Sequence, residues 1–113
     1  MPAYMIARID VTDPERLKDY LQHTPRILDR FGGRFIVRGA PVVTVEGPEE
    51  THRVVVIEFP DTESAHAFYD SDEYGLAIAI RQEASTGQFM IVDGYGHDEW
   101  QSVLAASKQL TLE

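Results

Sequence analysis

The chain has 113 residues, which is enough for one compact domain with a single hydrophobic core. Nineteen acidic residues against ten basic ones give a formal net charge of −9 at pH 7. This excess of negative charge argues against nucleic acid as a partner, and the lack of cysteine excludes disulfides and thiolate chemistry. Residues 1–12 include Arg8 and Asp10 and no long apolar segment, so we expect a cytoplasmic protein with neither a signal peptide nor a membrane span.

The first part of the chain predicts a strand, a helix and a second strand. Residues 4–11 are mostly apolar and run into a helix cap with proline in the first turn. Apolar residues then recur at three- and four-residue steps, which predicts a helix over residues 14–31, ended by Gly32-Gly33. We expect Pro25 to bend this helix, because proline removes a backbone hydrogen bond. A strand is expected over residues 34–38.

The middle of the chain predicts an antiparallel hairpin. After an interruption at Gly39-Ala40-Pro41, the extended pattern resumes over residues 42–46, and residues 47–51 reverse the chain into a strand over 52–59. Pairing across that turn places Glu46 near Arg53.

The last part predicts a helix in two pieces, a strand and a short terminal helix. The helix begins after Pro60, breaks at Asp70-Ser71-Asp72 and ends at Thr86-Gly87, and a strand follows over residues 88–95. Residues 1–95 are therefore expected to form one domain and residues 96–113 a helical extension. An isolated helix of that length is marginal in water, so we expect it to dock through Trp100, on its own domain or across a dimer.

The resulting order is strand, helix, strand, strand, helix, strand. This order predicts an α+β, ferredoxin-like βαββαβ fold with a four-stranded antiparallel sheet and both helices on one face. Neither set of alternate positions in the strand over residues 52–59 is polar throughout, so the uncovered face also needs a cover. We therefore expect a homodimer in which a second copy covers that face.

Several blocks of the sequence resemble one known family. They are the segments 3–8, 32–35, 37–39, 56–60, 69–71 and 73–74, together with Arg81. They are similar to the 1330-type "domain of unknown function" family over about residues 2–95. The resemblance implies the fold of the dimeric alpha-beta barrels, in which two ferredoxin-like sheets close face to face. Relatives in that superfamily include cofactor-free monooxygenases, small isomerases and haem-binding enzymes, and the resemblance assigns no reaction to particular residues here.

Arg38 and Glu58 are the candidate catalytic pair. A charged group near the end of an apolar strand needs a partner or a ligand, and strand pairing could bring these two together. A carboxylate beside an arginine in a cleft could act as a general base or hold a small polar or anionic metabolite. A structural ion pair that stabilises the strand ends is the alternative.

Five further residues are candidates for ligand binding around the same cleft. They are Tyr20, His66, Tyr69, Tyr74 and Arg81. The four histidines show no metal-binding spacing, and the sequence predicts neither a metal site nor a cofactor.

Two hypotheses of different classes follow. The first is a small-molecule-binding protein or cofactor-independent enzyme, monooxygenase- or isomerase-like, with a pocket between sheet and helices in each subunit. The second is a non-catalytic dimeric structural or interaction module, in which the same residues stabilise the fold. A sizeable cavity reached by Arg38 and Glu58 favours the first, and a filled core with the two in direct contact favours the second.

Overall fold

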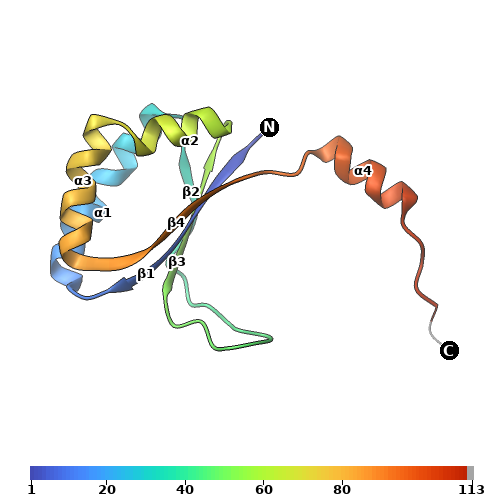
Figure 1. Ribbon diagram of the computed structural model, residues 1–113, viewed down its shortest axis with the longest axis horizontal. Coiled ribbons are helices and arrows are strands. Elements are labelled where there is room, and N and C mark those ends of the chain that lie inside the picture. Colours follow the sequence, from blue (N-terminus) through green and yellow to red (C-terminus); the bar gives the residue numbers. More distant parts are fainter. Residues whose placement is uncertain (112–113) are drawn as a thin grey trace.

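The computed structural model describes residues 1–111, which form a four-stranded antiparallel sheet with helices on one face and a separate C-terminal helix (Figure 1). In chain order the elements are β1 (Ala3–Val11), α1 (Pro14–Arg30), β2 (Arg34–Arg38), β3 (Arg53–Phe59), α2 (Thr62–Tyr69), α3 (Asp72–Ala84), β4 (Ser85–Asp93) and α4 (His97–Ala106). The strands lie in the order β2-β3-β1-β4. The predicted α+β, ferredoxin-like fold class is therefore confirmed.

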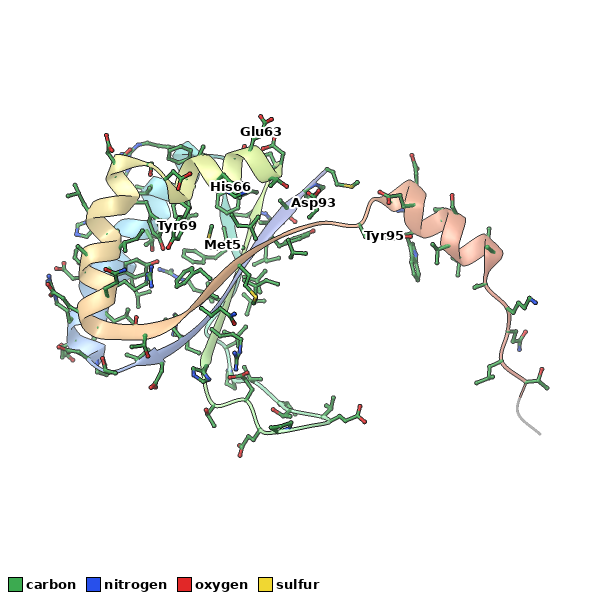
Figure 2. The ribbon with its side chains drawn as sticks, viewed as in Figure 1. Met5, Glu63, His66, Tyr69, Asp93 and Tyr95 are labelled. Carbon is green, nitrogen blue, oxygen red and sulfur yellow. The ribbon has the colours of Figure 1, made fainter. Side chains whose placement is uncertain are left out.

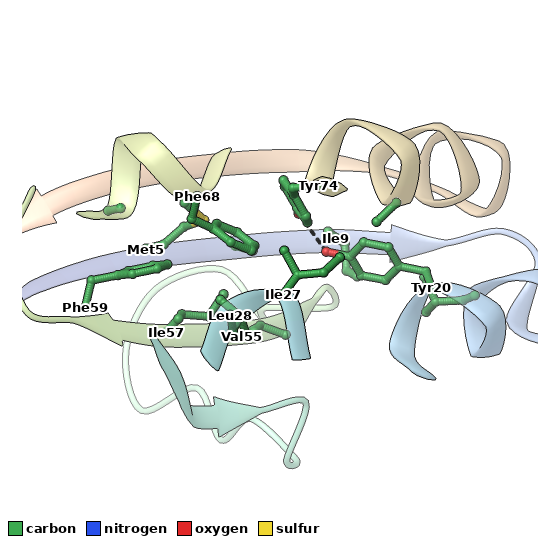
Figure 3. Packing of buried hydrophobic residues seen from close by; sticks show 14 of the residues in the cluster. Met5, Ile9, Tyr20, Ile27, Leu28, Val55, Ile57, Phe59, Phe68 and Tyr74 are labelled. Atoms are coloured by element: carbon green, nitrogen blue, oxygen red, sulfur yellow. Dashed lines mark hydrogen bonds between the residues drawn. The ribbon is translucent and has the colours of Figure 1, made fainter. Parts of the chain in front are cut away.

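The hydrophobic core lies between the sheet and helices α1 to α3 (Figure 3). In β1, Met5, Ala7 and Ile9 are buried, whereas the residues between them are more exposed. This alternation follows from the two-residue period of a strand, which sends successive side chains to opposite faces. Leu28 of α1 and Phe68 of α2 are each 1% exposed and pack on the covered face.

Helix boundaries follow the predicted capping signals. Asp13 caps α1 by accepting a hydrogen bond from the backbone N–H of Arg16, at 3.1 Å. The predicted division of the second helix is confirmed, because α2 and α3 are separate helices. Ser71 lies at the division: its hydroxyl accepts from the N–H of Tyr74 and donates to the carbonyl of Phe68.

The strand predicted over residues 42–46 is wrong. β2 ends at Arg38, and Gly39 turns the chain away from the sheet with a φ of 76°. β3 begins only at Arg53, so no ladder reaches residues 42–46 and Glu46 does not face Arg53. Residues 39–52 instead form a long loop that projects from the sheet (Figure 1).

The predicted boundary between the second helix and the last strand is also wrong. α3 ends at Ala84, and Thr86 and Gly87 pair with β1 inside β4 rather than ending the helix. A Cβ atom on Gly87 would lie 2.4 Å from the carbonyl oxygen of Arg8, so the close approach of β1 requires glycine there.

The C-terminal helix does not dock on its own domain. α4 begins at His97, as predicted, but none of its residues is buried, and Trp100 is 51% exposed. Together with the loop over residues 39–52, α4 extends beyond the sheet, away from α1 to α3 (Figure 1). The Cα radius of gyration is 17.2 Å, against about 13 Å for a compact domain of this length.

The face of the sheet opposite the helices carries apolar side chains across all four strands. Ile6 in β1 lies between Val56 of β3 and Met90 of β4, and Val37 of β2 extends the same row. Met90 is 39% exposed and Val37 37%. No helix within residues 1–111 covers this face, as the sequence predicted.

Candidate functional site

A groove lies between the edge strand β4 and helix α2 (Figure 2). Its volume is about 530 Å³, within the range of small-molecule pockets. The lining residues are Met5, Thr62, His66, Tyr69, Phe89, Met90, Ile91 and Asp93. At one end of the groove the Thr62 hydroxyl donates to a carboxylate oxygen of Asp93 at 2.9 Å, which ties the start of α2 to the end of β4.

A second cavity lies behind Phe89, between the sheet and helices α1 and α3. We call it the arginine chamber, because Arg38, Arg53 and Arg81 line it together. Its other lining residues are Ala7, Ile9, Tyr20, Leu21, Phe35, Val55, Ile57 and Phe89. The chamber has a volume of about 20 Å³, which is room for about one water molecule. Phe89 lines both spaces and so separates the groove from the chamber.

Two tyrosine hydroxyls meet at the chamber. The hydroxyls of Tyr20 and Tyr74 are 2.7 Å apart and buried (Figure 3). Burial raises the pKa of both phenols above the ordinary value, with the Arg81 guanidinium acting in the opposite direction. Both side chains therefore stay protonated at neutral pH; one hydroxyl donates to the other, which leaves one O–H of the pair free to donate.

Arg81 reaches the chamber from the last turns of α3. It is only 6% exposed, and its guanidinium stacks on the ring of Phe89 at 4.0 Å from the ring centroid. Its Nε atom is buried and has no hydrogen-bond partner. A buried guanidinium without a counter-charge is costly, yet the atoms that line the chamber are almost all apolar.

Arg38 closes the chamber on the β2 side, and a proline makes its contact possible. Pro25 has no N–H to donate to the carbonyl of Leu21, four residues earlier in α1. That carbonyl instead accepts a hydrogen bond from Nη2 of Arg38, at 3.0 Å. The Arg38 side chain is exposed and also lies over Phe35, 4.4 Å from the ring centroid.

Arg53 is the third arginine of the chamber, and its position depends on Gly39. A Cβ atom on Gly39 would lie 2.2 Å from Nη1 of Arg53, so the guanidinium packs directly on the glycine backbone. Like Arg81, Arg53 has a buried Nε atom without a hydrogen-bond partner.

The predicted proximity of Arg38 and Glu58 is wrong. Arg38 pairs with Val55 on the helix side of the sheet, whereas Glu58 pairs with Arg34 and lies on the open face. Glu58 accepts a hydrogen bond from Arg34 at 3.3 Å. The physical reason is the irregularity between Phe35 and Val37, which shifts the alternation of β2 by one residue. Catalytic roles for the two residues stay predictions, but they cannot share one site within a subunit.

The five predicted ligand-binding residues fall into two neighbouring groups. Tyr20 and Arg81 line the chamber, with Tyr74 behind Tyr20, while His66 and Tyr69 line the groove. Sequence reasoning missed Arg53 and Phe89. A charged residue in an apolar strand is the signal that singled out Arg38, and Arg53 shows the same signal. Arg53 was instead predicted to pair with Glu46.

Residues 1–111 hold no cluster of three or more histidine, aspartate or glutamate side chains that could bind a metal ion. Within the same residues, no helix has the length and hydropathy needed to span a bilayer.

Comparisons with known proteins agree with this fold. The model of the family described as a domain of unknown function (DUF1330) matches residues 2–95, which confirms the resemblance found in the sequence. No curated protein matches the chain. Solved structures of similar fold include the RPA0582 protein of unknown function from Rhodopseudomonas palustris, at 18% identity and a TM-score of 0.67, covering 84% of this chain and 83% of the other.

Two further structures carry activity names. SnoaB, a cofactor-independent oxygenase from Streptomyces nogalater, is 12% identical with a TM-score of 0.61, covering 84% of this chain and 94% of SnoaB. A putative antibiotic biosynthesis monooxygenase from Nitrosomonas europaea is 12% identical with a TM-score of 0.52, covering 81% of this chain and 89% of the other. At these identities the likeness is one of fold.

Proposed function

The chain belongs to the DUF1330 family, and on that premise we propose that it is a homodimer that binds a small organic molecule in the groove between β4 and α2 of each subunit. The observation that carries the binding proposal is the groove itself. It combines about 530 Å³ of space with a lining that is half apolar side chains and half side chains with polar groups, among the latter His66 and Tyr69.

Two observations support the homodimer. The open face of the sheet carries a row of apolar side chains, and exposing this apolar surface to water is unfavourable in free energy. The loop over residues 39–52 and helix α4 extend from the domain on the side away from the helices, with Val45 93% and Trp100 51% exposed. A second copy placed against the open face buries both kinds of surface.

Cofactor-independent catalysis is part of this proposal. The neutral pair Tyr20 and Tyr74 stands behind Phe89 with Arg81 beside it, and such donors stabilise negative charge that develops on a ligand oxygen. The oxygenase named among the similar folds supports this version by analogy of fold alone. The groove also offers His66 as a group able to transfer protons.

The second candidate function is a non-catalytic dimeric module. The small volume of the chamber, about 20 Å³, favours it, because a nearly filled interior is what a structural domain requires. In this version Arg38 and the tyrosine pair stabilise helix docking and bind nothing else.

A substitution that fills the groove separates the two functions. His66 and Ala67 are neighbouring exposed residues of α2, and only His66 lines the groove. We expect a panel of phenols, ketones and carboxylic acids to contain compounds that raise the melting temperature of the parent protein, because a ligand of the native state stabilises it. His66→Trp should abolish that increase, and the matched control Ala67→Trp should keep it.

Two results oppose the binding proposal. Thermal stabilisation that survives His66→Trp places the ligand elsewhere. A panel that stabilises none of the three proteins favours the non-catalytic module.

A further inference from the structure

Strand β4 is a long sheet edge without the features that protect most edges. It pairs with β1 over nine residues without a register shift, and β1 is its only partner strand within residues 1–111. Residues 85–92 include no charged residue and no proline. Such an edge presents unpaired backbone groups to which another strand can add. The opposite edge, β2, is protected, because it has only five residues, an irregular register and an arginine at each end.

The segment 42–46 is mostly apolar, projects from the sheet and has no partner strand. Val43 and Val45 are 81% and 93% exposed, whereas Thr44 between them is half-buried. This alternation has the two-residue period of a strand. Within residues 1–111, no backbone group of the segment takes part in a backbone hydrogen bond. The segment therefore has the side-chain pattern of a strand and lacks a strand with which to pair.

A two-fold dimer brings the segment and the edge together. Sheets that pack face to face keep their strand directions aligned. A two-fold axis along the strands then places the β2 edge of one copy over the β4 edge of the other, because the strand order is β2-β3-β1-β4. The loop over residues 39–52 follows β2 and projects away from the helices, toward the open side of the sheet (Figure 1). It therefore extends toward the β4 edge of the second copy.

We propose that residues 42–46 of each copy pair with the free edge of β4 in the other copy, as an additional strand of its sheet. This inference rests on the proposed homodimer. The two sheet faces alone supply roughly 950 Å², whereas standard stable interfaces begin at about 1,200 Å². The dimer therefore needs contacts beyond the faces. The added strands supply them by pairing backbone groups that are unpaired in a single subunit and by burying Val43 and Val45 beside Met90.

The added strand also gives the groove an outer wall. Side chains alternate across a strand, so burial of Val43 and Val45 on the open face directs Thr44 to the helix side of β4. That side carries Phe89 and Ile91, which line the groove. The ligand site is then shared between subunits, with β4 and α2 from one copy and the Thr44 side chain from the other.

Amide hydrogen exchange, resolved by residue in NMR spectra, tests the backbone pairing. In an antiparallel ladder, every second N–H of β4 points toward β1 and the others point away. We expect both sets within residues 86–92 to exchange slowly in the parent dimer. Val56→Asp places a charge on the open face and should separate the copies. In that monomer the outward set should exchange at least about tenfold faster than the inward set.

Disulfide formation tests which segments meet, since the chain has no cysteine of its own. Val45→Cys is combined with Gln88→Cys, Met90→Cys or Val92→Cys, which lie along the open face of β4. Facing residues of neighbouring strands are close enough for a disulfide, so we expect at least one pair to give a covalent dimer on a non-reducing gel. Leu76→Cys, on α3 and 77% exposed, replaces Val45→Cys in the matched control and should give none.

The outcomes separate the strand pairing from the homodimer. A parent that is monomeric at every concentration overturns both. A dimer whose outward β4 amides exchange as fast as those of the monomer overturns the pairing and leaves the homodimer in place. The pairing is also overturned if no Val45→Cys pair crosslinks better than its Leu76→Cys control. If Val56→Asp does not fold, dilution of the parent below its dimer Kd supplies the monomer.

Discussion

Adjacent valines on β3 provide the sharpest test of the homodimer. Val55 faces the helices and is 9% exposed, while Val56 faces the open side of the sheet between Ile6 and Val37. An aspartate at either position adds the same charge to the same strand on opposite faces. Val55→Asp should therefore unfold the subunit, and Val56→Asp should leave it folded but monomeric.

The expected size of the effect follows from the dimensions of the sheet. Strands of nine, five, seven and nine residues, spaced at about 4.8 Å and rising about 3.3 Å per residue, give a face of roughly 480 Å² per copy. Two faces supply roughly 950 Å², less than a standard stable interface. The projecting loop and α4 are needed to exceed that size. An unpaired buried carboxylate costs several kcal/mol, and with two per dimer the Kd should rise by at least about a thousandfold.

Light scattering coupled to size exclusion measures the mass, and urea unfolding measures the stability of each variant. The parent should have twice the 12.8 kDa chain mass at micromolar concentration. A monomeric parent, or a Val56→Asp variant that is as dimeric as the parent, would falsify the use of the open face as the interface. A folded Val55→Asp variant of parental stability contradicts the assignment of the two faces.

Two other predictions concern the projecting segments. Removal of the residues after Tyr95 deletes helix α4, none of whose residues is buried in its own subunit. We therefore expect weaker dimerisation in sedimentation experiments, and an unchanged melting temperature at concentrations where the parent is monomeric. Equal dimer affinity refutes a role for α4 in the interface. The second is pH dependence: hydrogen bonds from the His52 backbone and from Arg8 lower the pKa of Glu50 to about 2. Because this pKa lies below the unfolded value of 4.5, Glu50 contributes stability above pH 4.5, and that stability is lost as the pH falls toward 2. Glu50→Gln should therefore make the free energy of unfolding less dependent on pH over that range. An identical pH dependence of unfolding in the parent and the variant contradicts this reasoning.

The sequence predicted the element order because the strong signals are local. Hydrophobic periodicity, the cap at Asp13 and the serine at the break between α2 and α3 act within a few residues of where they occur. The bare apolar face was also predictable, since alternate positions in β3 leave no polar side. Segment 42–46 was mispredicted because an extended apolar pattern needs a partner strand, and that partner is absent.

The candidate site was only partly predictable, because it depends on register. Arg34 and Arg38 are four residues apart and would share a face in a regular strand, which would place Arg38 on the same face as Glu58. The irregularity between Phe35 and Val37 moves Arg38 to the other face, and no local residue pattern predicts this irregularity. The contact between Arg38 and Leu21 is equally non-local, although Pro25, which leaves that carbonyl without its helical donor, is visible in the sequence.

Strand β4 links the two proposals physically. Phe89 faces the helices and separates groove from chamber, and the next residue, Met90, pairs with Ile6 on the open face and also lines the groove. β4 is an edge strand with neighbours on one side only, so its position is less constrained than that of β1. A second copy packed on the open face holds Met90 and thereby fixes the strand that carries Phe89. In the proposed homodimer, the interface surface therefore also sets the shape of the proposed pocket, because both depend on the same edge strand.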